Sequence, residues 1–215
     1  SVKVKGDDYE IPDEIKTDIV LGDLLKIGNH KLLCGDSTDS DNIDKIMGSD
    51  KADLVFTDPD FSMSFDLLKS VYSNAVIFSK GIGFWVCGDK QSVQIAMNDF
   101  ENFAKFFVQD FRQATLVSNN QPMTRHVMIV QMGRKAMNNL HDGFSTLLQI
   151  ATDRTSEVHK TTPMSKKVEL PAEFISHYSN EGDIVLDFFG HSGSTMVAAH
   201  QLNMRCNIIE IEPKY

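Results

Sequence analysis

A turn of small residues at positions 190–194, Gly-His-Ser-Gly-Ser, carries the first candidate chemistry of the sequence. The apolar run IVLDFF precedes it, and the segment TMVAAHQL after it has the apolar spacing of a helix. A sharp strand-to-helix turn can expose a nucleophilic serine, as in hydrolases, or it can hold a nucleoside-like ligand on its backbone N–H groups. The surrounding residues decide between these two chemistries.

The hydrolase interpretation is disfavoured by the position of the histidines. The turn departs from the G-x-S-x-G motif in its last residue, Ser194. The one histidine after Ser192 is His200, which lies on the predicted helix that the turn itself begins. A histidine in that place cannot reach back over the serine as a general base. A phosphate-binding P-loop is excluded because no lysine follows the glycines.

A ligand cradle fits the same residues better. Glycine and serine at a helix N-terminus expose backbone N–H groups and the positive end of the helix dipole. Glu210 ends the next apolar run and follows Gly193 at close to the roughly 20-residue offset at which nucleotide-binding folds place an acid for the ribose hydroxyls. The turn therefore predicts a site for a nucleoside-like cofactor.

The elements that would position this turn alternate between buried strands and helices. Apolar runs predict strands at 30–38, 52–61, 82–89, 114–120, 125–133, 183–189 and 206–212. Helical spacing predicts helices at 40–48, 64–76, 90–107, 166–179 and 194–202, the first of them capped by Ser40. This alternation predicts an α/β fold with a mostly parallel sheet covered by helices on both faces. Because ligands bind beyond the carboxyl ends of such strands, Asp36, Asp58 and Glu210 should share one edge with the turn.

The composition is typical of one soluble globular domain, with 215 residues of which 41% are hydrophobic and 24% charged. No apolar run approaches the roughly 18 residues that a membrane span needs, and no signal-peptide pattern is present, so no membrane contact is expected. The three cysteines lie singly, which fits a reducing cytoplasm. The seven histidines form no ligand-like pairs, so no metal is expected.

The charge is unevenly distributed along the chain. The net charge is −9, which by itself disfavours tight binding to nucleic acid. Residues 101–167 nevertheless carry nine lysines and arginines against five acids, a net charge of +4, so the remainder carries −13. A basic middle segment is a weak indication of a side that faces a polyanion, and a solvated surface is an equal alternative.

Five segments together carry a resemblance to a known family. They are, in chain order, LLCGDST, ADLVFTDPDF, KKVEL, VLDFFGHSGSTMVAA and IIEIEPKY. Their order and spacing resemble the permuted, beta-class-like amino-DNA methyltransferases, in which the catalytic motif precedes the cofactor-binding one. The resemblance covers the chain from about Val20 to Tyr215. It implies a Rossmann-like methyltransferase fold with a circularly permuted motif order, S-adenosylmethionine as the cofactor and DNA as the partner.

The resemblance also implies a domain organisation. The segment LGDLLKIGNHKLLCGDST is similar to phage and prophage methylases, some of restriction-modification type, that carry another domain upstream. Residues 1–19 are therefore expected to be a linker or tail, and residues 20–215 the catalytic domain of a cytoplasmic, bacterial or phage-encoded enzyme. Only residues 136–160 stand where the family inserts its target-recognition region. Sequence recognition would then come from short loops, a homodimer, a partner chain or a missing domain.

The catalytic motif implied by the resemblance is Asp58-Pro59-Asp60-Phe61, where the family has Asp-Pro-Pro-Tyr or Asp-Pro-Pro-Phe. In the family, the carboxylate and the next carbonyl accept hydrogen bonds from the exocyclic amine of a flipped base, and the aromatic ring stacks on that base. Asp58, Pro59 and Phe61 are thus the expected catalytic residues. The expected reaction is methyl transfer to adenine N6, ahead of cytosine N4.

Other positions matching family motifs supply the remaining expected contacts. The cofactor-binding residues are expected to be Asp36, Asp58, Lys166, Phe189, Gly190, Ser192, Gly193, Ser194 and Glu210. Candidate contacts to nucleic acid, chosen as polar residues of the basic segment, are Asn119, Asn120, Gln121 and Arg125.

Three departures from the family pattern leave an alternative open. Asp60 and Phe188 replace prolines, and His191 replaces the first glycine of the cradle. Asp60 places a second charge beside Asp58, which should raise one of the two pKa values. The alternative function is therefore a weakened or inactive methyltransferase-like subunit that binds cofactor or DNA as a partner.

Overall fold

The computed structural model describes residues 3–5, 17–115, 124–138, 144–151 and 167–214. Nine strands in these residues form one sheet with the order β1-β2-β9-β8-β3-β4-β6-β5-β7. The strands are β1 Leu24–Ile27, β2 His30–Cys34, β3 Leu54–Thr57, β4 Gly83–Cys87, β5 Phe103–Thr115, β6 Thr124–Met132, β7 Leu147–Leu148, β8 Ile184–Asp187 and β9 Arg205–Glu210. The helices are α1 Ser40–Met47, α2 Phe65–Phe78, α3 Asp89–Asn98, α5 Glu169–Tyr178 and α6 Ser194–Gln201.

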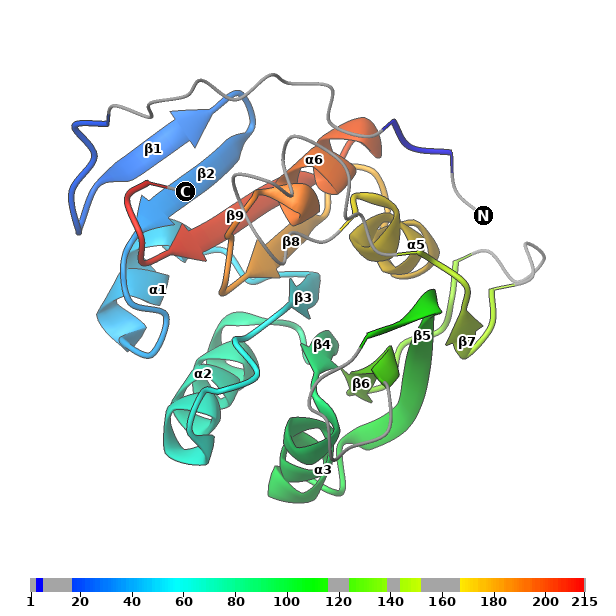
Figure 1. Ribbon diagram of the computed structural model, residues 1–215. Coiled ribbons are helices and arrows are strands. Elements are labelled where there is room, and N and C mark those ends of the chain that lie inside the picture. The colour runs from blue at the N-terminus through cyan, green and yellow to red at the C-terminus, as the bar shows by residue number, and fades with distance from the viewer. Residues whose placement is uncertain (1–2, 6–16, 116–123, 139–143, 152–166, 215) are drawn as a thin grey trace.

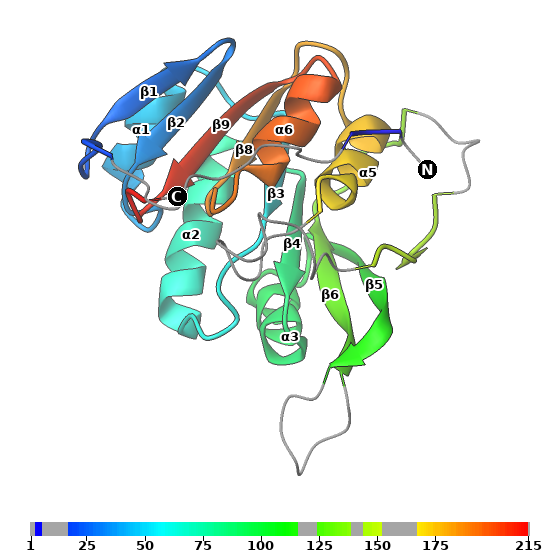
Figure 2. The ribbon, with the colours of Figure 1, turned by 45° about the horizontal axis from the view of Figure 1, so that its top comes forward.

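The middle of the sheet is parallel, and antiparallel pairs flank it on both sides. Strands β2, β9, β8, β3 and β4 pair in parallel. Strand β1 pairs antiparallel with β2, and β6 pairs antiparallel with both β4 and β5. The expected α/β fold is therefore confirmed, as a mixed sheet whose parallel part is central. The β5–β6 hairpin extends away from the other strands (Figure 2).

Helices cover both faces of the sheet, with α1, α2 and α3 on one face and α5 and α6 on the other (Figure 1). The alternation of side chains along a strand explains this double burial. Leu54 and Phe56 of β3 belong to the apolar cluster that includes Phe174 of α5 and Ala198 of α6. Val55, between them, belongs to the cluster with residues of α1 and α2. A strand buried on both sides has the continuous apolar sequence from which it was predicted.

The helix expected at 90–107 is shorter than the sequence indicates. Helix α3 ends at Asn98, and the chain turns through residues 99–102 before β5 begins at Phe103. Strand β5 pairs with β6 from Phe103↔Met132 onward, and the buried Phe107 side chain packs edge-on against Phe84 of β4. Tertiary pairing outweighs the helical spacing of the sequence here.

Two details at helix starts also differ from or refine the expectation. The side chain that caps α1 is Asp39, which accepts a hydrogen bond from the Asp41 N–H, and Ser40 is the first helical residue. Pro171 lies in the first turn of α5, where its missing N–H costs no helical hydrogen bond.

Candidate functional site

The predicted site residues lie at the carboxyl ends of the parallel strands. Asp36 follows β2, Glu210 ends β9, and Asp58 follows β3. The turn 188–193 follows β8, which lies between β9 and β3. Since parallel neighbours end at the same edge of the sheet, the structure brings these residues to one side of the molecule, as the sequence predicts.

The Asp58-Pro59-Asp60-Phe61 segment leaves the sheet directly after β3. Pro59 is buried and Asp58 is half-buried, whereas Phe61 is 40% exposed. The ring of Phe61 lies beside the backbone of Gly88, because a Cβ added to Gly88 would be 3.5 Å from the ring Cγ and Cδ2 atoms. Phe61 also lines a cavity of about 340 Å³ formed with residues 62–65 and 88–91 and with Gln94. An aromatic ring that is exposed and supported from behind is suited to stacking on a planar ligand.

Asp60 uses its carboxylate within its own turn. One carboxylate oxygen accepts hydrogen bonds from the Ser62 N–H and hydroxyl, each at 2.6 Å. These two bonds lower the pKa of Asp60, the hydroxyl bond being the largest cause. Asp60 is therefore not the member of the pair whose pKa is raised, because Ser62 stabilises its charged form.

A buried polar network joins the end of β3 to the start of the turn after β8. The Thr57 hydroxyl accepts a hydrogen bond from the Phe188 N–H at 3.2 Å and also bonds the Asp187 carboxylate. The other bonds of Asp187 come from the Thr195 hydroxyl at 2.6 Å and the Phe189 N–H at 3.0 Å. The residue before Asp58 is thus tied to the cradle. Phe188, where the family has proline, supplies an N–H that proline lacks.

The Asp187 carboxyl is strongly perturbed by its position. Burial, with a smaller contribution from the charge of Asp58, raises its pKa to about 7 against the lowering effect of its three hydrogen bonds. Asp187 lies inside the strand predicted at 183–189 and is not among the predicted site residues. A carboxylate inside an otherwise apolar run, IVLDFF, was the signal that could have identified it.

The turn at 190–194 has the backbone of a cradle. His191 adopts a φ of 42° and Gly193 a φ of 74°, so two residues of the turn are left-handed. Histidine is somewhat strained at this angle, since the left-handed region favours glycine. A Cβ on Gly190 would lie 3.0 Å from Ile208 Cδ1, so this glycine permits the close approach of the turn to β9. The departure at His191 therefore leaves the turn geometry in place.

Glu210 stands beside the cradle and is oriented by backbone donors. Its carboxylate accepts hydrogen bonds from the His191 N–H at 2.7 Å and from the Glu212 N–H at 2.9 Å. Gly193, the residue before α6, supplies no side-chain hydrogen bond to the first turn of that helix. The N-terminal N–H groups of α6 and the remaining lone pairs of Glu210 can therefore serve a ligand.

Asp36 is held at the same edge by the neighbouring strand. Its carboxylate accepts two hydrogen bonds from Thr38, from the backbone N–H and the hydroxyl, each at 2.8 Å. The preceding Gly35 N–H donates to the Glu210 carbonyl at 2.9 Å, which ties the two acidic residues together through the backbone. Ser192, Ser194 and Phe189 are all half-buried along the turn.

Several predicted contacts lie outside the described residues. These are Lys166, Asn119, Asn120 and Gln121. Arg125 is described, at the start of β6, and its guanidinium contacts the Asp110 carboxylate across the hairpin at 3.3 Å. Of the segment 136–160, the described residues include β7, which pairs in parallel with β5 at the edge of the sheet.

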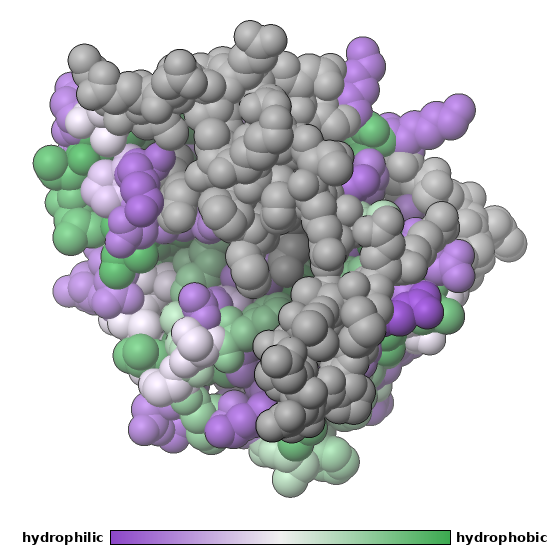
Figure 3. Space-filling model, in the orientation of Figure 1, coloured by the Kyte–Doolittle hydropathy of each residue, from purple (hydrophilic) through white to green (hydrophobic). Residues whose placement is uncertain are grey.

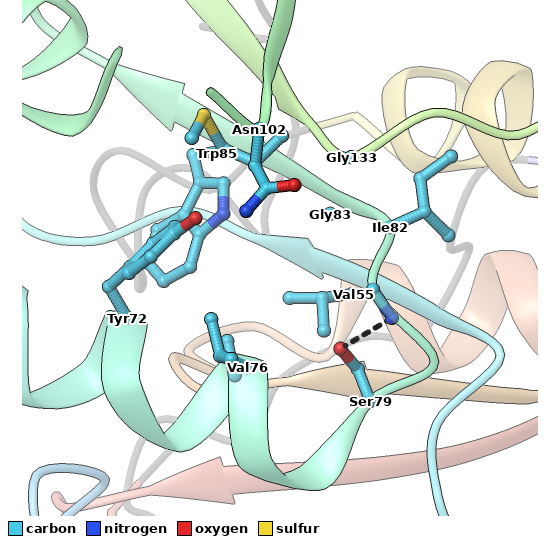
Figure 4. Close-up of a pocket in the computed structure, with 12 residues that line it drawn as sticks. Val55, Tyr72, Val76, Ser79, Ile82, Gly83, Trp85, Asn102 and Gly133 are labelled. Atoms are coloured by element: carbon cyan, nitrogen blue, oxygen red, sulfur yellow. Dashed lines mark hydrogen bonds between the residues drawn. The ribbon is translucent and has the colours of Figure 1, made fainter. Parts of the chain in front are cut away.

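A second cavity, of about 90 Å³, lies away from this site (Figure 4). Val55, Gly83 and Trp85 line it at the β3–β4 pair, together with Tyr72 and Val76 of α2. Figure 4 also shows the hydrogen bond from the Gly81 N–H to the Ser79 hydroxyl, at 3.2 Å. Gly81 and Ser79 precede β4, so this cavity opens at the edge of the sheet opposite to Asp58.

The described residues contain no group of three or more histidine, cysteine, aspartate or glutamate side chains that could hold a metal ion. Among those same residues, no helix is long and apolar enough to cross a membrane. Where described residues are visible in Figure 3, hydrophilic and hydrophobic side chains are mixed.

Comparison with known proteins finds similarity to DNA methyltransferases. Residues 130–215 match a protein-family model described as DNA methylase. The matched range includes the cradle and Glu210 and leaves the Asp58 segment outside. No curated protein matches the sequence.

Solved structures match most of the chain. The M1.HpyAVI–SAM complex is 20% identical with a TM-score of 0.68, covering 84% of this chain and 93% of that one. The cytosine-N4-specific PvuII DNA methyltransferase is 19% identical with a TM-score of 0.71, covering 87% and 84%. A putative DNA modification methylase from Thermus thermophilus, complexed with S-adenosyl-L-methionine, is 17% identical with a TM-score of 0.58, covering 86% and 89%. The chain thus has the Rossmann-like fold of the DNA methyltransferases, and its C-terminal part matches the DNA methylase family.

Proposed function

We propose that this protein is a DNA methyltransferase that transfers a methyl group from S-adenosylmethionine to the exocyclic amine of an extruded base. One observation carries the proposal: the Asp58 segment and the 190–194 cradle leave neighbouring parallel strands at the same edge and are joined through Thr57. An acceptor held at Asp58 and a donor held in the cradle would therefore face each other.

The residues at this edge fit the cofactor chemically. Glu210 and the N–H groups of the turn suit a ribose and a carboxylate, respectively. The carboxylates of Asp36, Asp58 and Glu210 favour a cation, which a sulfonium is. S-adenosylmethionine would supply an electrophilic methyl group and leave as a neutral thioether.

Side-chain and backbone groups of residues 58–61 would orient the amine. The Asp58 carboxylate and the Pro59 carbonyl accept hydrogen bonds from the two amine hydrogens, which turns the nitrogen lone pair out of conjugation with the ring. Phe61 stacks on the base and replaces the stacking on neighbouring bases that the extruded base has lost. The bound cofactor would supply its methyl group to this lone pair, and the methylated amine would release one proton to the Asp58 carboxylate that accepts its hydrogen bond. The gain in rate comes mainly from this alignment.

The proposal also concerns which base receives the methyl group. Adenine N6 is placed ahead of cytosine N4 because a purine offers Phe61 the larger stacking surface. The test is methyl incorporation from labelled S-adenosylmethionine into unmodified DNA, followed by mass spectrometry of the nucleosides. N6-methyladenine supports the whole proposal, and N4-methylcytosine supports the reaction while correcting the base. Absence of both from a protein that binds the cofactor contradicts the proposed reaction.

A further inference from the structure

Gln91 is a buried amide in the first turn of α3, behind the candidate catalytic segment. Its side chain is 3% exposed, and its Nε2 atom donates a hydrogen bond to the Asp60 carbonyl oxygen at 2.8 Å. Because a carbonyl can only accept, the bond fixes which end of the amide faces the segment. The Oε1 atom of the same amide has no hydrogen-bond partner among the described residues.

The Asp60 carbonyl is the point at which the catalytic segment turns. The same oxygen accepts a hydrogen bond from the Met63 N–H at 2.9 Å. The peptide plane that contains it also contains the Phe61 N–H, so its orientation sets the direction in which the Phe61 ring leaves the backbone. Gly88, just before α3, lies beside that ring. The junction of β4 with α3 thus contacts the segment at two adjacent residues.

We propose that Gln91 is a positioning residue for methyl transfer, which holds the Asp60–Phe61 peptide so that the Pro59 carbonyl and the Phe61 ring meet the extruded base together. The inference rests on the proposed function. Proteins rarely bury an amide oxygen without a partner, so the hydrogen bond of the Nε2 atom to Asp60 is the contact that accounts for this side chain. Gln91 does not touch the reacting atoms in this account, because it acts through the backbone of Asp60.

The first test compares two variants of the same helix. Gln91→Met keeps the length of the side chain and removes the donor. Gln94→Met is the matched control, since Gln94 lines the same cavity one turn later and, among the described residues, makes no such bond to the segment. Gln91→Met should lower kcat about tenfold to a hundredfold, with the KM for S-adenosylmethionine nearly unchanged, because misalignment of the acceptor affects the transfer step. Gln94→Met should keep the kcat of the native protein.

A second variant separates positioning from packing. Gln91→Glu should be poorly active at high pH, where a carboxylate would face the Asp60 carbonyl without a donor. On acidification the introduced carboxyl would gain a proton that it can donate, so activity relative to the native protein should rise. Burial would raise the pKa of the introduced group, as would the negative charges of Asp89 and of Asp60 on the facing segment, and the positive charge of Lys90 would oppose them. A role in packing alone would instead leave Gln91→Met, which fills a similar volume without a donor, as active as the native protein at every pH.

A measurement without turnover keeps this inference distinct from the proposed function. Amide hydrogen exchange over residues 58–64 should be faster in Gln91→Met than in the native protein and in Gln94→Met. Native kcat in Gln91→Met, or unchanged exchange in a folded variant, would overturn the role of Gln91. If the native protein transfers no methyl group, the proposed function fails, and Gln91 has no role in methyl transfer. Faster exchange in Gln91→Met would in that case still show that Gln91 holds residues 58–64 in place.

Discussion

Asp187 should make the stability of this protein depend on pH in the neutral range. In the unfolded chain its carboxyl would titrate near 3.8, whereas burial raises its pKa in the folded protein to about 7. Between these values the folded protein holds a proton that the unfolded chain has released. The free energy of unfolding contributed by this group therefore falls as the pH rises from about 4 to about 7, and the loss is complete above that range.

The magnitude follows from the two pKa values. They differ by roughly three, and each pKa unit corresponds to about 1.4 kcal/mol, so the loss is at most about 4 kcal/mol. Asp187→Asn removes the titration and keeps an oxygen for the bonds from Thr195 or Phe189. The variant should therefore gain stability relative to the native protein by up to this amount between about pH 4.5 and pH 8. At low pH, where the native carboxyl is protonated, the variant should be somewhat less stable than the native protein, because the introduced amide nitrogen cannot accept the second of these bonds.

Urea unfolding at a series of pH values measures this difference. The single tryptophan, Trp85, is buried with 1% exposure and reports unfolding by its fluorescence. The control is Glu101→Gln, which neutralises an exposed carboxylate at the start of the β5 region. If the difference in stability between Asp187→Asn and the native protein stays constant from pH 4.5 to 8, the Asp187 carboxyl does not titrate near neutrality and the reasoning is refuted.

Two further substitutions test the joint between strand and cradle. Thr57→Val should lower the free energy of unfolding by about 2–3 kcal/mol, because it leaves the Phe188 N–H and an Asp187 oxygen unpaired in the interior. Thr57→Ser keeps the hydroxyl and should retain most of the native stability. Equal stability of the valine and serine variants in urea would contradict this. His191→Val should lower the free energy of unfolding by about 1–2 kcal/mol and weaken cofactor binding measured by calorimetry, because a β-branched residue tolerates a positive φ poorly. Native cofactor affinity in that variant would show that binding does not need a left-handed residue at this position.

The sequence predicts the parts of the site that depend on strand order along the chain. Asp36, Asp58 and Glu210 each follow an apolar run, and a parallel sheet places such residues at one edge without knowledge of the register. The cradle is equally local, since glycine and serine before a helical pattern mark it. The antiparallel side of the sheet is not predicted, because the apolar runs of β4 and β6 do not show which way they pair.

The contacts missed by the sequence analysis are those between distant segments. Gln91 meets Asp60 across 31 positions of the chain, and Thr57 meets Phe188 across 131 positions. Hydrophobic periodicity shows which face of an element is buried, and it does not show which buried polar groups will meet. The helix expected through residue 107 fails for the same reason, since pairing of β5 with β6 depends on residues far along the chain.

The role of Asp58 in methyl transfer is measured by comparing the native protein with Asp58→Ala on the same unmodified DNA. Labelled S-adenosylmethionine supplies the methyl group, and mass spectrometry identifies the methylated nucleoside. We expect methylation of an exocyclic amine by the native protein and none by Asp58→Ala, with the unfolding midpoint of the variant unchanged and the cofactor still bound, though more weakly because one carboxylate that favours the sulfonium is gone. Methylation that persists in Asp58→Ala, or a native protein that binds the cofactor and methylates no base, would contradict this expectation.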